Sequence, residues 1–196
     1  MRHLYSCLDL DQIKEVMSFV PGGLQEVMKD YHLILAGGFI RDIIAGKTPN
    51  DIDLWCMDSD RCSMAAMLYV AKIGGDIGWG DFAGTVTQEG SFPVAFIYAR
   101  PYATPEALID SFDYSVCRAA IWWNGFFWES MVDVGFKRDI ETRRLSYRDG
   151  RREEVDPDLV VQRLSKLIRK GYTPYWWSLE EMVLGWRSKK QGGGDD

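Results

Sequence analysis

Apolar residues recur at helical spacing through the first part of the chain. Those that follow Asp9 are Leu10, Ile13, Val16, Met17 and Val20. Aspartate is a favoured N-cap residue, so this pattern predicts a helix that begins directly after Asp9. The segment 21–23, Pro-Gly-Gly, interrupts the pattern before a shorter helical stretch over residues 24–28. We therefore expect a helical lead-in over residues 1–30.

The next segment predicts a strand, a turn and a helix in close succession. Residues 33–36 form a short apolar run that ends at Gly37 and Gly38. Residues 39–45 then follow at helical spacing until Gly46, a residue typical of a helix C-terminus. The glycine pair is therefore predicted to lie at a strand-to-helix turn.

Strands and helices continue to intermix beyond this turn. Residues 51–56 alternate between polar and apolar as a strand does, and Asp58 is placed to cap a helix that reaches residue 71. Residues 84–88 and 92–98 are two further alternating runs around a glutamate-glycine pair. This pattern is typical of an antiparallel strand pair.

The segment 114–134 gives the clearest local prediction in the chain. Two apolar runs, 114–123 and 126–134, flank Asn124 and Gly125. Asparagine-glycine is the pair that tight primed turns favour, so we expect a β-hairpin with a two-residue turn.

The order of these elements predicts the class of fold and a division of the chain. Strands and helices mix without regular β-α alternation, which favours an α+β fold with a mixed sheet flanked by helices. Pro157 opens a final amphipathic helix that Gly171 closes. We expect four segments: the helical lead-in 1–30, a core 31–150, a helical segment 151–187 and a disordered tail 188–196.

Composition places the chain among ordinary soluble globular proteins. It has 196 residues, of which 46% are hydrophobic and 27% charged. These values disfavour disordered, collagen-like and membrane classes. No apolar run reaches the length of a signal peptide or a membrane span, so we expect a cytoplasmic location and no membrane partner. The cysteines lack CxxC spacing and are expected to be reduced and mostly buried, with neither a zinc site nor a disulfide framework: Cys7, Cys56, Cys62 and Cys117.

The net charge of -6 is unevenly distributed. Residues 1–136 carry 9 Lys+Arg against 18 Asp+Glu, whereas residues 137–170 carry 11 against 7. The second stretch is either a footprint for a nucleic acid or a solvated surface with many arginine-carboxylate pairs.

One group of residues has the pattern of a chemically active site. Asp51 and Asp53 are two apart in a predicted strand, so both side chains lie on one face. Paired carboxylates repel each other unless a cation neutralises them, and their hard oxygens suit Mg²⁺ or Mn²⁺. Before them stands the Gly37-Gly38 turn at a helix N-terminus, where backbone N–H groups favour phosphate, with Arg41 in the first turn of that helix. The spacing predicts a phosphate-binding turn and a metal-binding pair that share one nucleotide.

The residues from Gly37 to Asp53 read GGFIRDIIAGKTPNDID. This string resembles the core motif of the DNA polymerase beta superfamily, in particular that of tRNA nucleotidyltransferases (CCA-adding enzymes) and bacterial poly(A) polymerases. Residues 112–119 resemble the family's RRDFTINA stretch, and 155–157 with the helix that follows resemble its EDPLRxLRA helix.

The resemblance implies a nucleotidyltransferase head fold followed by a short helical neck. It implies Mg²⁺- or Mn²⁺-dependent transfer of a nucleoside monophosphate from an NTP to an acceptor hydroxyl, with RNA, such as a tRNA 3′ end, as the expected acceptor. Asp51 and Asp53 would be the catalytic metal ligands. Gly37, Gly38 and Arg41 would contact the triphosphate.

A third acid is usual in this superfamily, but the strand 92–97 contains none. Asp113, at the start of the next predicted strand, is the candidate for a third catalytic carboxylate, against a role in capping a turn. The chain also departs from the family at five positions, which makes a complete templated CCA addition unexpected: Ser111, Phe112, Cys117, Val155 and Leu159.

Two alternatives to an RNA acceptor stay open. In the first, the same chemistry modifies a protein or a small molecule. In the second, the chain is a catalytically silent module that binds nucleotide or RNA. The intact carboxylate pair argues against silence, and the missing third acid argues for it.

Overall fold

The computed structural model describes residues 5–148 and 156–191, and for residues 185–191 it describes the backbone alone. The strands are β1 (Tyr5–Ser6), β2 (Ile34–Ala36), β3 (Ile52–Trp55), β4 (Asp76–Trp79), β5 (Ala83–Thr87), β6 (Val94–Ile97), β7 (Ala119–Trp123), β8 (Trp128–Asp133), β9 (Arg144–Leu145) and β10 (Thr173–Pro174). The helices are α1 (Leu10–Ser18), α2 (Gly22–Tyr31), α3 (Gly38–Ile44), α4 (Ser59–Ile73), α5 (Pro105–Asp110), α6 (Phe136–Glu141), α7 (Pro157–Arg169) and α8 (Trp176–Gln191), with a 3-10 helix η1 (Ser115–Cys117).

A mixed sheet organises the fold, as predicted. Its strand order is β1-β8-β7-β2-β3-β6-β5-β4. Among these strands β3 and β6 pair in parallel, while β2 pairs antiparallel with both β3 and β7. β9 and β10 form a separate small parallel pair. The predicted α+β fold with a mixed sheet flanked by helices is confirmed.

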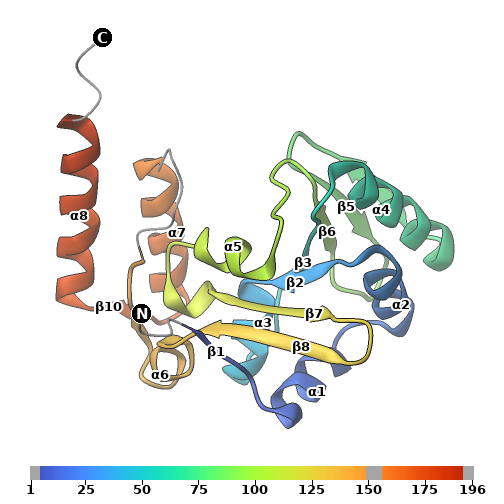
Figure 1. The fold of residues 1–196 in the computed structure, drawn as a ribbon, viewed down its shortest axis with the longest axis horizontal. Helices are drawn as coiled ribbons and strands as arrows, with labels where there is room; N and C mark the ends of the chain where they lie inside the picture. Colours follow the sequence, from blue (N-terminus) through green and yellow to red (C-terminus); the bar gives the residue numbers. More distant parts are fainter. Residues whose placement is uncertain (1–4, 149–155, 192–196) are drawn as a thin grey trace.

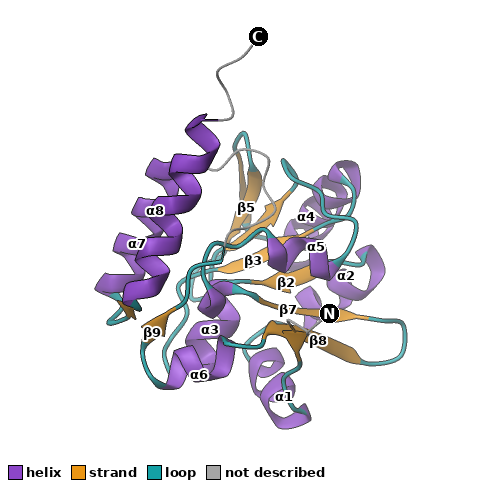
Figure 2. Ribbon diagram, turned by 60° about the vertical axis from the view of Figure 1, so that its left-hand side comes forward, coloured by secondary structure: helices purple, strands orange, loops and turns teal. Residues whose placement is uncertain are grey.

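Helices cover both faces of the sheet, and a helical pair stands at one end. The larger apolar core lies between the sheet and helices α1 to α4. A smaller core lies beneath α5, on the opposite face. Figures 1 and 2 show α7 and α8 side by side beyond the sheet. Within the described ranges, no helix is both long and apolar enough to cross a membrane.

Local sequence signals set several helix boundaries. Asp9 caps α1 in a reciprocal capping box with Gln12, and Asp58 caps α4 through the N–H groups of Asp60 and Arg61. Each cap satisfies N–H groups that have no partner within the helix. The predicted starts of these helices are therefore confirmed.

The hairpin of β7 and β8 forms, but two details of its prediction were wrong. Residues 114–118 contain the 3-10 helix η1 instead of continuing the strand. Trp123 pairs with Trp128, so the turn comprises residues 124–127 and is not a two-residue turn. The Asn124 side chain accepts hydrogen bonds from the N–H groups of Phe126 and Phe127, which stabilises the longer turn.

The expectation of reduced cysteines was wrong for two of the four, whereas Cys7 and Cys117 are free thiols. Cys56 and Cys62 are joined in a disulfide, with Cα atoms 5.6 Å apart. Cys56 follows β3, and Cys62 lies in the first turns of α4. The chain reverses direction between them, where Asp58 caps α4, and this brings the two cysteines together. Cys7 is exposed and Cys117 is half-buried.

Two other segments differ from the sequence-based expectation. β4 was not predicted; it has four residues, and three of them are exposed. α8 reaches Gln191, so residues 188–191 of the expected tail are helical, whereas residues 192–196 lie outside the described residues.

Candidate active site

β3 presents carboxylates on the face of the sheet that α5 partly covers. Ile52 and Leu54 are fully buried in the larger core, while Asp53, between them, faces the opposite side. Asp51 stands immediately before the strand and is exposed. Asp51 and Asp53 line one cavity, so the structure brings the two predicted residues together.

The electrostatics of this pair favour a bound cation. Burial and the neighbouring charge of Asp51 raise the pKa of Asp53 to about 6, and the charge of Lys166 opposes this rise. Within the described ranges, His, Cys, Asp and Glu side chains form no group of three that could hold a metal. Two carboxylates completed by substrate phosphates are nevertheless a common arrangement for Mg²⁺. The donor set at Asp51 and Asp53 therefore fits Mg²⁺ or Mn²⁺.

The predicted glycine turn joins β2 to α3. Gly37 has a φ of +88°, a conformation that side chains disfavour. At Gly38, an added Cβ would lie 3.1 Å from Nη2 of Arg41. Both glycines line the cavity beside the carboxylate pair, so the backbone is accessible there.

Arg41 also lines the cavity, but it is more tightly held than the sequence indicated. Its Nε donates to Asp42 Oδ1 at 2.8 Å, and its Nη1 lies 3.3 Å from Cys117 Sγ. Burial would raise the pKa of Asp42, but the hydrogen bond and charge of Arg41, followed by those of Lys170, lower it below its ordinary value. Asp42 thus orients the guanidinium and leaves Nη2 beside Gly38.

α7 places a basic face over the core. The cations of α7 and its C-cap that line the cavity are Arg163, Lys166, Arg169 and Lys170. Lys170 Nζ contacts Asp42 at 2.6 Å, and Arg163 Nη1 contacts Asp113 at 2.5 Å. This part of the positive excess in residues 137–170 therefore faces the cavity.

Asp113, the predicted third acid, lines the same cavity. It is buried, and its carboxylate is held by Arg163. On β6, the strand beside β3, the residue in register with Asp53 is Ala95. The neighbouring strand therefore has a methyl group at the position where an additional carboxylate would lie closest to Asp53. A catalytic role for Asp113 stays a prediction.

The cavity has a volume of about 510 Å³ and includes an aromatic wall that the sequence reasoning missed. This wall consists of Trp55, Tyr102 and Phe112. Trp55 follows Asp53 by two residues in β3 and so shares its face. That spacing is the signal that would have identified it.

α7 is the helix that resembles the EDPLRxLRA helix, and its aspartate acts as a cap. Asp156 caps α7 by accepting the N–H groups of Asp158 and Leu159. Val155 lies outside the described residues. Arg163 is the side chain of this helix that both lines the cavity and binds a core carboxylate.

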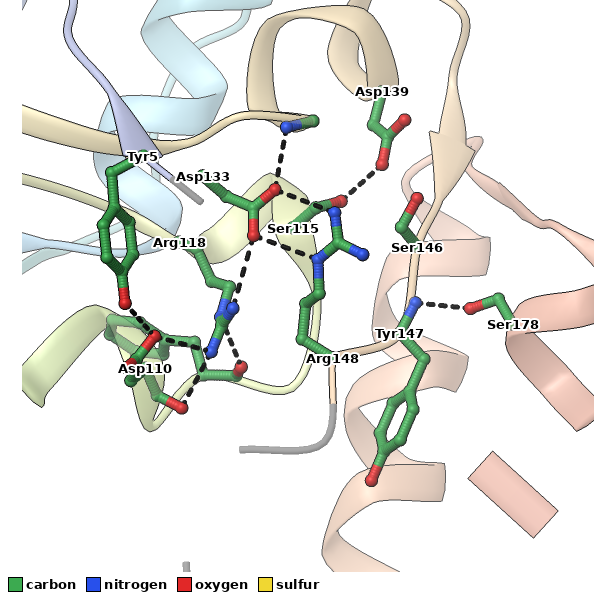
Figure 3. Close-up of polar contacts among 12 residues, drawn as sticks. Tyr5, Asp110, Ser115, Arg118, Asp133, Asp139, Ser146, Tyr147, Arg148 and Ser178 are labelled. Atoms are coloured by element: carbon green, nitrogen blue, oxygen red, sulfur yellow. Dashed lines mark hydrogen bonds and ion pairs between the residues drawn. The ribbon is translucent and has the colours of Figure 1, made fainter. Parts of the chain in front are cut away.

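A buried ionic network supports the segment that ends at Arg148 (Figure 3). Asp133 accepts hydrogen bonds from Arg148 Nε and Nη2, both at 3.0 Å, and from Arg118 Nη1 at 3.3 Å. Arg118 Nη2 also donates to Asp110, which accepts from Tyr5. Burial alone would raise the pKa of Asp133, but the bonds from Arg148 and from a backbone N–H lower it below its ordinary value. Through Arg118, the residue before β7, the network joins β1, α5 and β8 to Arg148.

A second set of contacts ties the same segment to α6 and α8. Asp139 is fully buried and accepts Ser115 Oγ at 2.5 Å and Arg138 Nε at 2.8 Å. The N–H of Tyr147 donates to Ser178 Oγ in α8 (Figure 3). The helical pair is therefore anchored to the core through the residues just before the undescribed segment 149–155.

The chain has detectable similarity to a protein family and to solved structures. The profile described as "Gabija anti-defense 2 family protein" matches residues 11–139. A search of curated proteins found no match.

The structural neighbours share the fold at low identity. An apo form of a CCA-adding enzyme superposes with a TM-score of 0.65 and 16% identity, over 92% of this chain and 45% of the other. The Thermotoga maritima CCA-adding enzyme complexed with tRNA gives a TM-score of 0.61 and 15% identity, over 92% and 45%. A tRNA nucleotidyltransferase complexed with a primer tRNA and an incoming ATP analog gives 0.60 and 17%, over 81% and 48%. The chain thus has a nucleotidyltransferase-like head fold and spans less than half the length of these neighbours.

Proposed function

We propose an activity for this chain, which belongs to the Gabija anti-defense 2 family and has a nucleotidyltransferase-like head. It catalyses the metal-dependent transfer of a nucleoside monophosphate from an NTP to an acceptor hydroxyl. One observation carries the proposal. The carboxylates of Asp51 and Asp53 line a single cavity together with a bare glycine turn and a basic helix face. Two anionic ligands beside many cations suit a substrate that brings both phosphate and metal.

Each group in the cavity has a distinct role in this proposal. Asp51 and Asp53 would hold Mg²⁺ or Mn²⁺, which supplies charge neutralisation at the phosphates when bound. The backbone at Gly37 and Gly38 and the Nη2 group of Arg41 would bind the triphosphate. In the reaction, the acceptor oxygen bonds to the α-phosphorus, the bond from that phosphorus to the bridging oxygen breaks, and pyrophosphate leaves with the electron pair. The hydroxyl proton passes to water.

We propose RNA as the acceptor class, with a tRNA 3′ end as one example. The basic face of α7 supports this choice, as do two structural neighbours that are complexed with tRNA. We propose counter-defence as the biological setting, because the chain belongs to the Gabija anti-defense 2 family. α7 and α8 would act as a short neck beside the head.

Label transfer tests the proposal directly. The pure protein is incubated with each labelled NTP and Mg²⁺, together with total RNA or with protein extract. Label in RNA supports the proposal, label in protein moves the acceptor to a polypeptide, and no label in either supports the silent binding module. With all four NTPs present, sequencing of extended RNA should show no strict C-C-A order, because Leu159 offers no polar group to a base and Asp156 is used as a cap.

The glycine turn gives a separate prediction. In Gly38→Val, a branched side chain would displace Arg41 Nη2, which lies 3.1 Å from the position of an added Cβ. We expect NTP affinity to fall by about 10-fold or more, the equivalent of one lost charge-assisted hydrogen bond. Titration calorimetry with a non-hydrolysable ATP analogue measures the affinity.

Gly46→Val is the matched control, because Gly46 has a φ of +65°, open space around it and no place in the cavity lining. The Gly46→Val variant should be less stable because of backbone strain, while its nucleotide affinity should be unchanged. Equal affinity in wild type and Gly38→Val would remove the phosphate role of this turn.

A further inference from the structure

The aromatic wall of the cavity forms a continuous cluster at one end of β3. The Trp55 ring meets Tyr102 edge to face at 5.7 Å between centroids and Phe112 at 5.9 Å. The indole Nε1 of Trp55 is buried without a hydrogen-bond partner among the described residues. Arg100, which is exposed, lines the cavity beside these rings. The cluster thus combines ring surface with a nearby cation.

Trp55 and Tyr102 lie at the opposite end of β3 from the glycine turn, whereas Phe112 extends to that turn, with its ring 3.6 Å from the position of an added Cβ at Gly37. β2 and β3 are antiparallel, with Ile34 opposite Trp55. The chain leaves β2 after Ala36, so the glycine turn lies toward Asp51, and Trp55 lies beyond Asp53 at the other end. Along β3, Asp53 therefore stands between the glycine turn and Trp55.

The order of these groups along β3 bears on the geometry of phosphoryl transfer. The inference drawn from it rests on the proposed function. The attacking oxygen and the leaving oxygen must lie on opposite sides of the phosphorus. If the leaving pyrophosphate is held at the glycine turn, the acceptor hydroxyl approaches from the side of Trp55. Trp55 and Tyr102 are then the part of the aromatic wall that the acceptor contacts.

The chemistry of the wall fits a nucleobase better than a peptide. Bases of single strands stack on aromatic side chains. A guanidinium can bind the phosphate on the 5′ side of the stacked nucleotide. Peptide acceptors are instead commonly recognised through main-chain hydrogen bonds along a strand or through grooves shaped for a helix.

We propose that Trp55, Tyr102 and Arg100 form an acceptor subsite that holds the 3′-terminal nucleotide of a single-stranded nucleic acid, with its base on the rings and its phosphate at Arg100. The backbone supports this arrangement, because the N–H of Tyr102 donates to the carbonyl of Cys56 at 3.3 Å. That bond fixes the Arg100–Tyr102 loop to the end of β3. The subsite selects for an unpaired base and tolerates different bases, since every base presents a flat face.

A thermodynamic cycle between protein and probe tests the subsite. The probes are two short single-stranded RNAs with a 5′ fluorescein and a free 3′ hydroxyl, one complete and one lacking the base of its last nucleotide. Fluorescence anisotropy measures the Kd of each probe for wild type, Tyr102→Leu and Tyr102→Phe. We expect Tyr102→Leu to weaken binding of the complete RNA by about 10-fold and to leave the abasic RNA unchanged. Tyr102→Phe, which keeps the ring, should bind both probes like wild type.

Two further variants separate the phosphate contact from the fold. Arg100→Gln replaces an exposed side chain and should weaken both probes equally, with a smaller salt dependence of Kd. Phe126→Ser alters a residue that is 86% exposed at the hairpin turn, away from the cavity lining, and should change neither Kd.

The outcomes distinguish this proposal from the proposed function. Equal loss of both probes in Tyr102→Leu, or no loss of either, overturns the base subsite even if NTP-dependent labelling of RNA continues. Absence of RNA binding in wild type also overturns it and leaves the protein acceptor for the labelling experiment. Base-dependent coupling without any label transfer would support the subsite and contradict the transfer reaction.

Discussion

The double variant Asp51→Asn, Asp53→Asn is expected to lose nucleotide transfer by more than about 100-fold while its melting temperature holds or rises. The carboxylates supply the negative charge that would hold the metal, and asparagine keeps their shape without that charge. The substitution should stabilise the folded state, because it removes the charge of Asp53, which is half-buried beside Asp51 and has a pKa raised to about 6. Single-turnover transfer and a thermal melt of the same preparation measure the two effects.

The raised pKa of Asp53 also sets a pH dependence in protein freed of divalent metal. The unfolded carboxyl ionises near pH 4, whereas the folded one does so near pH 6. The wild type should therefore lose stability as pH rises through this window, by an amount on the order of 1–3 kcal/mol, and Asp53→Asn should not.

Asp81→Asn serves as the matched control, because Asp81 is exposed and does not line the cavity. It should change neither the transfer rate nor the pH dependence of stability. Transfer at the wild-type rate in the double variant would end the assignment of this pair as catalytic.

Asp133→Asn is expected to lower the free energy of unfolding by about 3–5 kcal/mol, the cost of breaking a buried ion pair from one side. Asp133 accepts from both Arg118 and Arg148, and the amide would leave these two cations without their shared anion. Since the pKa of Asp133 is lowered, its stabilising contribution is fully present above the unfolded pKa and disappears as pH falls through the folded value. Urea denaturation at neutral and acidic pH measures both effects.

Asp11→Asn provides the comparison, because the Lys14–Asp11 pair is almost fully exposed. An exposed pair contributes at most about 1 kcal/mol, so this variant should unfold at nearly the wild-type urea concentration. If Asp133→Asn were equally mild, the network would not be what holds Arg148 in place.

The parts of the fold that sequence predicted are those set by local periodicity and capping. Asp9 and Asp58 cap the expected helices, and alternation along β3 predicted that Asp51 and Asp53 share a face. These features depend on neighbours within a few residues, so a single sequence contains the necessary information.

The parts that sequence did not predict depend on contacts between distant residues. The cations of α7 contact core carboxylates far away in the chain, such as Arg163 with Asp113 and Lys170 with Asp42. Periodicity identifies the polar face of a helix but not what that face contacts. The Cys56–Cys62 disulfide was missed for a different reason: the two residues are only six apart, but their pairing depends on the path of the chain between β3 and α4.

The position of β2 in the sheet has a consequence for folding during synthesis. β2 is completed at Ala36, yet one of its two neighbours is β7, which is not complete until Trp123. β1, at residues 5–6, pairs with β8 and so waits until residue 133 has been made. Such non-local pairing slows folding and leaves strand edges open to other chains in the meantime. A nascent chain that pauses before β7 therefore carries the complete Gly37–Asp53 motif on a sheet that lacks one side.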